Sequence, residues 1–289
     1  MPYVDYILSP YAELFPGIQR AIGTSDWSFE SSSAAGWVPR KQYVNVFRID
    51  LSSPLIRIVA SQSGETGLYT VPEFASQKFT AGMLAMVAWN GNYFDMASPS
   101  TIYGLAVSAG EVVNLPLSTD QPLCPWSLVI SEQPPPAGPG FQGTVQNVQS
   151  GGPLPLNMWV AVSGDEQIVA GGQNVATDQG PPVAARTVAG VSQDGATLFM
   201  ATIDGMETAA EPYGGSIIDA AQWLILAGAW AGINLDGGGS ATVARIAAGQ
   251  GPATLMNMPY GNENIAGKNN IPGAERTVGL CFGVAVMKP

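Results

Sequence analysis

The chain has 289 residues, of which 46% are hydrophobic and 11% charged, with 35 Gly and 23 Pro. This composition is typical of a compact, turn-rich fold rather than of a disordered chain. Because 22 acidic residues face only 11 basic ones, for a net charge of −11, no basic surface for nucleic acid is expected. The chain has no histidine, which excludes Ser/His/Asp and Cys/His catalysis and histidine-ligated zinc. Any proton transfer must use carboxylates, tyrosines, lysines or thiols.

The two cysteines, Cys124 and Cys281, are too few for a zinc ribbon and too far apart for a CxxC motif. They could form one disulfide or remain two buried thiols. The sequence contains no apolar run of membrane length and no basic segment followed by an apolar signal stretch. We therefore expect no membrane span and no secretion signal in the sequence as given, with compartment and oligomeric state left open.

The first part of the chain predicts an arm followed by strands. Residues 1–42 lack clear periodicity and are interpreted as an N-terminal arm packed on the body. Alternating residues at 43–51 and 54–62 predict two strands, antiparallel and joined by a Ser-Ser-Pro turn. Residues 71–83, with Pro72 in the first turn, predict a short helix.

The middle of the chain predicts more strands around one long insertion. A strand entering a polar turn is expected at 86–95, and a hairpin around Ala109-Gly110. Residues 131–156 are dense in Pro and Gly and are interpreted as a surface insertion. Further strands are expected at 158–164, 184–192, 197–205 and 275–287, with a hairpin turn at 193–195 between two of them.

One helix is predicted from its local signals. Ser216 and Asp219 have the spacing of a capping box, and the apolar run that follows them has helical periodicity. The helix is therefore expected over about 216–231, ended by Gly232.

The helix leads into INLDGGGSATV, residues 233–243, in which a strand pattern ends in an acid. Asp236 is followed by a bare backbone loop and one hydroxyl, made of Gly237, Gly238, Gly239 and Ser240. Glycines allow positive φ and let backbone N–H groups approach a ligand closely. An acid beside such a loop suits an anion or a sugar, although an ordinary tight turn would have the same sequence.

Other polar groups also stand at predicted strand ends and turns. They are Asn90, Tyr93, Arg186, Thr187, Asp204, Glu275 and Arg276. Arginine is suited to phosphate or carboxylate oxygens, and two carboxylates in different protonation states suffice for glycoside chemistry without histidine. Individually, Asp204 could be a turn residue, Arg276 half of an ion pair, and Asn90 a cap.

Taken together and in order, these segments resemble the phosphodiester glycosidase family. The resemblance extends over roughly residues 43–287. Its motifs are AWNGNYFD (88–95), GLAVSAGEVV (104–113), ARTVAG (185–190), ATIDG (201–205), NLDGGGSATV (234–243) and Arg276 in the last predicted strand.

The predicted fold is α+β: a mixed, strongly curved β-sheet with few helices and the helix at about 216–231 packed on it. The family-like domain would span 43–289, with the insertion at 131–156. The resemblance implies hydrolysis of a sugar-1-phosphodiester at its C–O bond, giving free sugar and a phosphomonoester. The expected partner is therefore a small molecule or glycan with a sugar-1-phosphate linkage.

The resemblance also implies roles for the candidate residues. Asp236 would act at the anomeric carbon or its water, with Asp204 or Glu275 as the acid or a sugar anchor. Phosphate would be held by Arg186, Thr187, Arg276, Gly237, Gly238, Gly239 and Ser240, and the sugar positioned by Asn90 and Tyr93. No cofactor is required, and Ca²⁺ is possible given the many acids. The alternatives are a non-catalytic glycan- or phosphate-binding module and a phosphodiesterase.

Overall fold

The computed structural model describes residues 5–29, 36–133, 140–177, 183–207, 212–260 and 274–289. Within these ranges the chain is mostly strand, with two α-helices, α1 (Val71–Lys78) and α2 (Ile217–Ala227). The predicted α+β fold, a curved sheet with few helices, is confirmed. Helix α1 is shorter than the range 71–83 expected from the sequence. Neither helix has the length and apolar character needed to cross a membrane.

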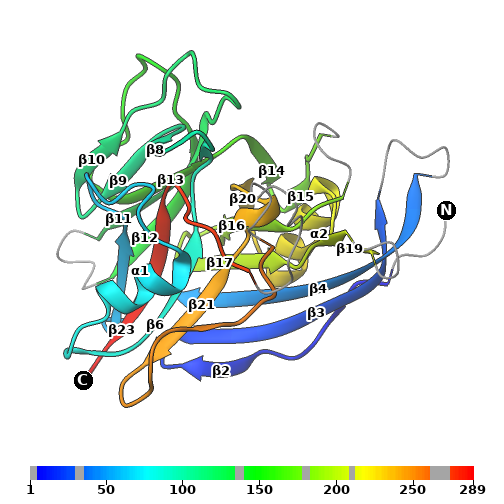
Figure 1. Ribbon diagram of the computed structural model, residues 1–289, viewed down its shortest axis with the longest axis horizontal. Coiled ribbons are helices and arrows are strands. Elements are labelled where there is room, and N and C mark those ends of the chain that lie inside the picture. Colours follow the sequence, from blue (N-terminus) through cyan, green and yellow to red (C-terminus); the bar gives the residue numbers. More distant parts are fainter. Residues whose placement is uncertain (1–4, 30–35, 134–139, 178–182, 208–211, 261–273) are drawn as a thin grey trace.

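The largest sheet, here the long sheet, curves along one side of the molecule (Figure 1). Its order is β1 (Ile7–Leu8), β3 (Ile18–Phe29), β4 (Trp37–Asp50), β17 (Thr197–Ile203), β16 (Arg186–Val191), β20 (Ala231–Asn234), β14 (Glu166–Ala170) and β15 (Gln173–Asn174). At its margin lie β2 (Ala12–Phe15), β18 (Met206–Glu207) and β19 (Pro212–Tyr213). The sheet is mixed, because β19 pairs parallel with β4 while the other pairs are antiparallel.

Two smaller sheets complete the body. The first, here the β6 sheet, has the order β22 (Thr254–Leu255), β21 (Val243–Ala247), β6 (Met83–Asn90), β23 (Cys281–Met287) and β5 (Ile56–Ala60). The second, here the β13 sheet, has the order β10 (Glu111–Asn114), β9 (Ala106–Ser108), β13 (Met158–Gly164), β11 (Trp126–Glu132) and β12 (Phe141–Asn147). A short ribbon is formed by β7 (Phe94–Asp95) and β8 (Ser98–Ile102).

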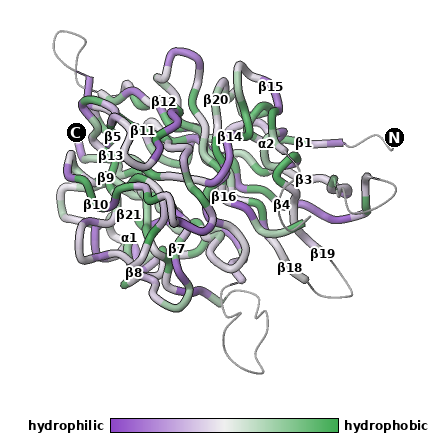
Figure 2. The backbone as a smooth tube through the Cα atoms, turned by 90° about the horizontal axis from the view of Figure 1, so that it is seen from above, coloured by the Kyte–Doolittle hydropathy of each residue, from purple (hydrophilic) through white to green (hydrophobic). Residues whose placement is uncertain are grey.

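The main core lies between the long sheet and the two smaller sheets. Phe47 of β4 packs edge-on against Trp89 of β6, with ring centroids 5.1 Å apart. On the opposite face of the long sheet, α2 forms a second core through Trp223, whose indole N–H donates to Gln42 over 2.8 Å. Figure 2 shows the apolar residues gathered along α2 and the strands beneath it. The long sheet is therefore covered on both faces.

The start of α2 agrees with its capping signal, but its end does not agree with the prediction. Ser216 accepts from the backbone N–H of Asp219, and Asp219 accepts from that of Ser216. The helix ends at Ala227 because Gly228 adopts a left-handed conformation with φ of 108°. Residue 231 already begins β20, so the expected end at Gly232 is wrong.

The predicted pairing of 43–51 with 54–62 is also wrong. Both segments contain strands, but β4 pairs with β3 and β17, whereas β5 pairs with β23 in another sheet. Both edges of β4 are occupied, so the turn after Asp50 carries the chain between sheets. The expected arm at 1–42 contains β1, β2 and β3, and the predicted boundary at 42 lies inside β4.

Two further segments differ from expectation. The predicted insertion at 131–156 includes β12, which pairs along β11 at the edge of the β13 sheet. The last strand begins at Cys281 rather than 275, so Arg276 precedes it in irregular backbone. A Cβ on Gly279 would lie 2.4 Å from Phe94 Cβ, which shows how closely this segment crosses the β7–β8 ribbon.

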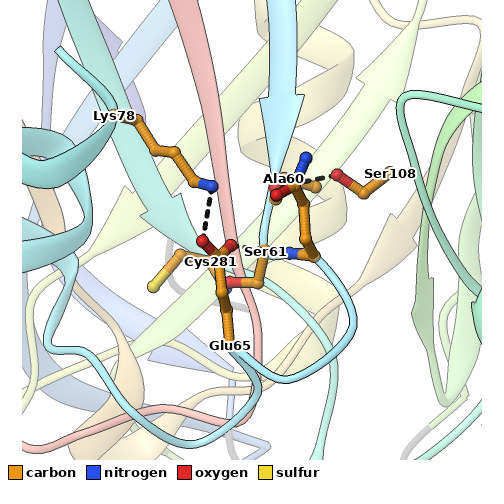
Figure 3. Close-up of polar contacts among 7 residues, drawn as sticks. Ala60, Ser61, Glu65, Lys78, Ser108 and Cys281 are labelled. Atoms are coloured by element: carbon orange, nitrogen blue, oxygen red, sulfur yellow. Dashed lines mark hydrogen bonds and ion pairs between the residues drawn. The ribbon is translucent and has the colours of Figure 1, made fainter.

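The two cysteines are free and buried rather than bridged. Burial raises the pKa of both thiols well above that of an exposed cysteine. Figure 3 shows the surroundings of Cys281, whose backbone N–H donates to Ser61 Oγ over 3.0 Å. Lys78 of α1 pairs with Glu65 over 2.7 Å in the same corner. Here β5, α1 and β23 are joined by polar contacts.

Candidate active site

The ends of three strands converge at one place: the end of β6, the start of β16 and the end of β20. Asn90 closes β6 and is fully buried. Its side-chain amide donates to the Asp236 carbonyl oxygen over 2.6 Å, and its Oδ1 accepts from Thr187 Oγ1 over 2.7 Å. Oδ1 also accepts from the Thr242 backbone N–H over 3.2 Å. Asn90 and Thr187 thus join the three segments and hold the backbone on both sides of the Asp236 loop.

The glycine loop after β20 is shaped by close packing. Gly237 is extended, and Gly238 has φ of 56° at the start of a 3₁₀ turn, η1 (Gly238–Ser240). A Cβ on Gly237 would lie 2.7 Å from the Ala185 carbonyl oxygen, so only glycine fits there. The N–H groups of Gly237 and Gly238 donate within the protein, to Asp236 Oδ1 and to Ala185. The loop therefore holds Asp236 in place, and its role in binding phosphate stays a prediction.

Asp236 is only 7% exposed. Its Oδ1 accepts from Gly237 N–H over 2.9 Å, whereas Oδ2 has no hydrogen-bond partner among the described residues. Burial raises the pKa of this carboxyl to about 6, although the Ser240 hydroxyl and the Arg276 charge oppose that change. The carboxyl therefore has one oxygen without a hydrogen-bond partner among the described residues and a pKa raised to about 6.

Arg276 and Ser240 lie close to Asp236, and both lower the pKa of its carboxyl. Arg276 Nε and Nη2 donate to Ser240 Oγ over 3.0 and 2.7 Å. Its guanidinium also stands 5.7 Å from the ring centre of Phe94, within range of a cation–π contact. The structure therefore brings Arg276, Ser240 and Asp236 together as the sequence predicted.

Asp165 is a second carboxylate in this cluster that sequence reasoning missed. The register of β14 with β20 pairs Glu166 with Asn234, which places Asp165 beside the end of β20. Asn234 donates to Asp165 Oδ1 and to the Tyr93 hydroxyl, each over 2.9 Å. Burial raises the pKa of Asp165, and hydrogen bonds from Asn234 and Tyr93 oppose it. Asp165 directly follows β13, and Asp236 lies two residues after β20, so a position just after a strand was the available signal.

Arg186 lies at the start of β16 and is almost fully buried. Its Nε donates to the Gly215 carbonyl oxygen over 3.2 Å. Burial lowers its pKa, and the nearby groups of Tyr93 and Asp165 oppose that shift. Arg186 thus supplies a positive charge on the Asp165 side of the cluster, while Arg276 supplies one on the Ser240 side.

The other two predicted acids lie outside this cluster. Asp204 accepts from Met258 N–H over 3.1 Å and lines a cavity of about 290 Å³ with Tyr43 and Tyr213. The backbone of Ala185 packs between Gly205 and Gly237, and so separates this cavity from the Asp236 loop.

Glu275 lies near Thr70, the residue that caps α1, whose hydroxyl opposes the rise in the pKa of Glu275. Burial raises the pKa of Asp204 to about 6 and raises that of Glu275. Among the described residues no group of three acids or cysteines could hold a metal ion, so the possible Ca²⁺ stays a prediction.

The chain is similar to one known protein family. The sequence profile of the phosphodiester glycosidase family matches residues 84–285. No curated protein matches the sequence significantly.

Two solved structures have a similar fold. The catalytic domain of zebrafish N-acetylglucosamine-1-phosphodiester alpha-N-acetylglucosaminidase, auto-inhibited by its pro-peptide, is 17% identical with a TM-score of 0.63. The match covers 99% of this chain and 88% of that chain. A hypothetical protein from Synechocystis is 15% identical with a TM-score of 0.56, covering 99% of this chain and 64% of that chain. At such identities the likeness concerns the fold alone.

Proposed function

The chain belongs to the phosphodiester glycosidase family, and on that premise we propose that it hydrolyses a sugar-1-phosphodiester to free sugar and a phosphomonoester. The observation that carries the proposal is the cluster of Asp236 and Asp165, two carboxyls whose pKa burial raises, beside Arg186 and Arg276. Two carboxyls in different protonation states can hydrolyse a glycoside, and the chain contains no histidine that could replace them.

Two buried oxygen atoms in the cluster lack hydrogen-bond partners among the described residues, which supports the proposal that a sugar binds here. These atoms are Asp236 Oδ2 and Asn234 Oδ1. Buried acceptors of this kind are normally satisfied, so they are suited to hydroxyl groups of a sugar or to water. Asn234 then positions a sugar hydroxyl, while Asp236 in its ionised form attacks the anomeric carbon or takes a proton from the attacking water.

Asp165 is the candidate proton donor in this scheme. In its protonated form it gives its proton to the oxygen that leaves with the phosphate, while Asn234 and Tyr93 orient the carboxyl. The C–O bond at the anomeric carbon breaks, and water supplies the new hydroxyl. A phosphate leaves readily, so weak protonation suffices. We assign this role to Asp165 rather than to Asp204 or Glu275, because Asp165 shares its hydrogen bonds with Asn234 and Tyr93.

The two arginines are suited to the phosphate. Arginine binds phosphate oxygens through its planar fork of N–H groups. Ser240 and Phe94 fix the guanidinium of Arg276, which limits the loss of side-chain freedom on binding. Arg186, already buried, stands on the other side near Asp165. Both charges offset the negative charge that develops on the leaving phosphate.

The test is the position of bond cleavage. Methyl diesters of glucose 1-phosphate and N-acetylglucosamine 1-phosphate are incubated with enzyme in ¹⁸O-labelled water, and the products are analysed by mass spectrometry. We expect ¹⁸O in the free sugar and none in the phosphomonoester. Label in the phosphate would instead identify a phosphodiesterase, and sugar binding without turnover across a wider panel would identify a binding module.

Two variants test the site itself. Asp236→Asn should lower kcat/KM on the order of 10³-fold, about 4 kcal/mol of transition-state stabilisation. Asp194→Asn is the control, because Asp194 lies in the exposed turn between β16 and β17. Full activity in Asp236→Asn would remove this residue from the mechanism.

A further inference from the structure

A second cavity, of about 350 Å³, lies between residues 116–125 and 148–150. Pro116, Leu117, Leu123 and Val148 are among the residues that line it. Leu117 and Leu123 are 55% and 58% exposed, so large apolar side chains meet solvent here. Apolar surface gathered around a hollow is typical of a ligand site.

Two polar side chains of the cavity wall, those of Asp120 and Cys124, are bonded to nearby backbone groups, and Ser118, Gln149 and Ser150 add uncharged polar groups to the wall. Asp120 Oδ2 accepts from Gly104 N–H over 2.9 Å and from Leu117 N–H over 3.0 Å. The Cys124 thiol is buried and donates to the Pro122 carbonyl oxygen over 3.4 Å. The described residues that line the cavity include no base, so it does not suit a phosphate. An uncharged, apolar group is the ligand that these walls favour.

Gly104 lies between the wall of this cavity and the residues of the candidate active site, and its N–H donates to Asp120 of the wall. A Cβ on Gly104 would lie 2.6 Å from the Cys124 carbonyl oxygen and 2.6 Å from Ser163 Cβ, so its backbone passes between them. The preceding residue, Tyr103, donates its N–H to the Tyr93 carbonyl oxygen over 2.8 Å. Gly104 thereby connects Asp120 in the cavity with Tyr93 in the active site.

The electrostatics agree with this proximity. The charges of Asp165 and Asp236 add to burial in raising the pKa of Cys124, so both carboxyls act on a residue of the cavity wall.

We infer that this cavity binds a hydrocarbon group on the phosphate of the substrate. The substrate class is then a phosphodiester that joins the anomeric oxygen of a sugar to an apolar alcohol, and this inference rests on the proposed function. The sugar and phosphate lie at Asp236 and Arg276, and the hydrocarbon extends past Gly104 to Leu117 and Leu123. The volume is at the lower end of ligand pockets, so a short chain fills it.

The test is a series of glucose 1-phosphate diesters that carry methyl, butyl, hexyl, octyl and dodecyl alcohols. Each buried methylene should raise kcat/KM by up to about four-fold, and the rise should stop once the cavity is full. Leu123→Gln should lower kcat/KM for the octyl ester about ten-fold or more and leave kcat/KM for the methyl ester unchanged. Equal rates along the wild-type series, or an unchanged slope in Leu123→Gln, would overturn the inference.

A matched control and a second measurement separate this inference from the proposed function. Leu226→Gln changes a leucine that is 41% exposed on α2, away from the cavity, and should keep the wild-type slope. Should no diester be hydrolysed, the proposed function fails, and octan-1-ol binding followed by NMR decides the cavity alone. Shifts at the leucine methyl groups that Leu123→Gln abolishes support the cavity; binding unaffected by Leu123→Gln, or none, overturns it.

Discussion

Two of the buried aspartates among the described residues lie next to regular elements: Asp219 in the first turn of α2, 0% exposed, and Asp236 shortly after β20, 7% exposed. Asp219 accepts from the hydroxyls of Tyr6, Ser28 and Ser216 over 2.5–2.7 Å and from the backbone N–H of Ser216. Both of its oxygens are therefore bonded within the protein.

Asp236 differs in the number of its partners rather than in its burial. One oxygen is bonded to Gly237, while the other has no partner among the described residues. A buried acceptor without a hydrogen bond lowers the stability of the fold. An unpaired buried acceptor is therefore expected where function, rather than stability, requires it. The comparison teaches that the number of hydrogen bonds, rather than burial alone, separates an acid that holds the fold from an acid available for chemistry.

The largest expected effect on stability is at Asp219. Asp219→Ala leaves the donors of Tyr6, Ser28 and Ser216 without their acceptor and removes the Asp219 half of the capping box at the start of α2. We expect a loss of about 3–5 kcal/mol in the free energy of unfolding, measured by urea denaturation. Asp194→Ala, in an exposed turn, serves as the control and should unfold close to wild type. Equal stability of both variants would show that the Asp219 network is not structural.

The opposite effect is expected at Asp236. Its folded pKa of about 6 exceeds the reference value of 3.8, so ionisation lowers native stability as pH rises from about 4 through 6. Asp236→Asn removes this cost and should stabilise the protein by about 2 kcal/mol at pH 8, with no gain at pH 3.5. Thermal unfolding at both pH values measures it. A destabilised variant at pH 8 would contradict the unpaired state of Oδ2.

A smaller effect on stability is expected at Thr187, where it distinguishes a residue that holds the Asp236 loop from one that binds substrate. Thr187→Val removes the hydroxyl that donates to Asn90 Oδ1 and keeps the shape of the side chain. We expect a loss of about 1–2 kcal/mol in unfolding free energy. KM should remain close to wild type, because the hydroxyl is directed at Asn90. Steady-state kinetics measure KM, and urea denaturation measures the free energy of unfolding. A raised KM with unchanged stability would instead support the substrate-binding role predicted for Thr187 from the sequence.

The smallest expected effect is a shift in the pH profile. If ionised Asp236 is the active form, kcat/KM should rise as the pH increases through about 6. The Ser240 hydroxyl holds the pKa of Asp236 down, so Ser240→Ala should move the rising limb to higher pH. Rates measured between pH 4 and 8 test this, with Ser192→Ala in the exposed β16–β17 turn as control. A shift to lower pH would contradict the contact.

Features fixed by a few neighbouring residues could be predicted from the sequence. The capping box of Ser216 and Asp219 located the start of α2, and the hairpin turns at 109–110 and 193–195 were correct. These succeed because each signal involves backbone groups only a few residues apart. The end of α2 was missed because Gly228, in a left-handed conformation, ends the helix before Gly232, the glycine that was expected to end it.

The sequence by itself therefore determined the local elements and the acid at the glycine loop, Asp236. Only the tertiary structure decided which strand ends meet. The pairing of β14 with β20 brings Asp165 to Asn234, and the packing of Ala185 between Gly205 and Gly237 keeps Asp204 apart. Strand pairing joins residues distant in the chain, and its partner and register depend on packing across the whole sheet, which no short stretch of sequence contains.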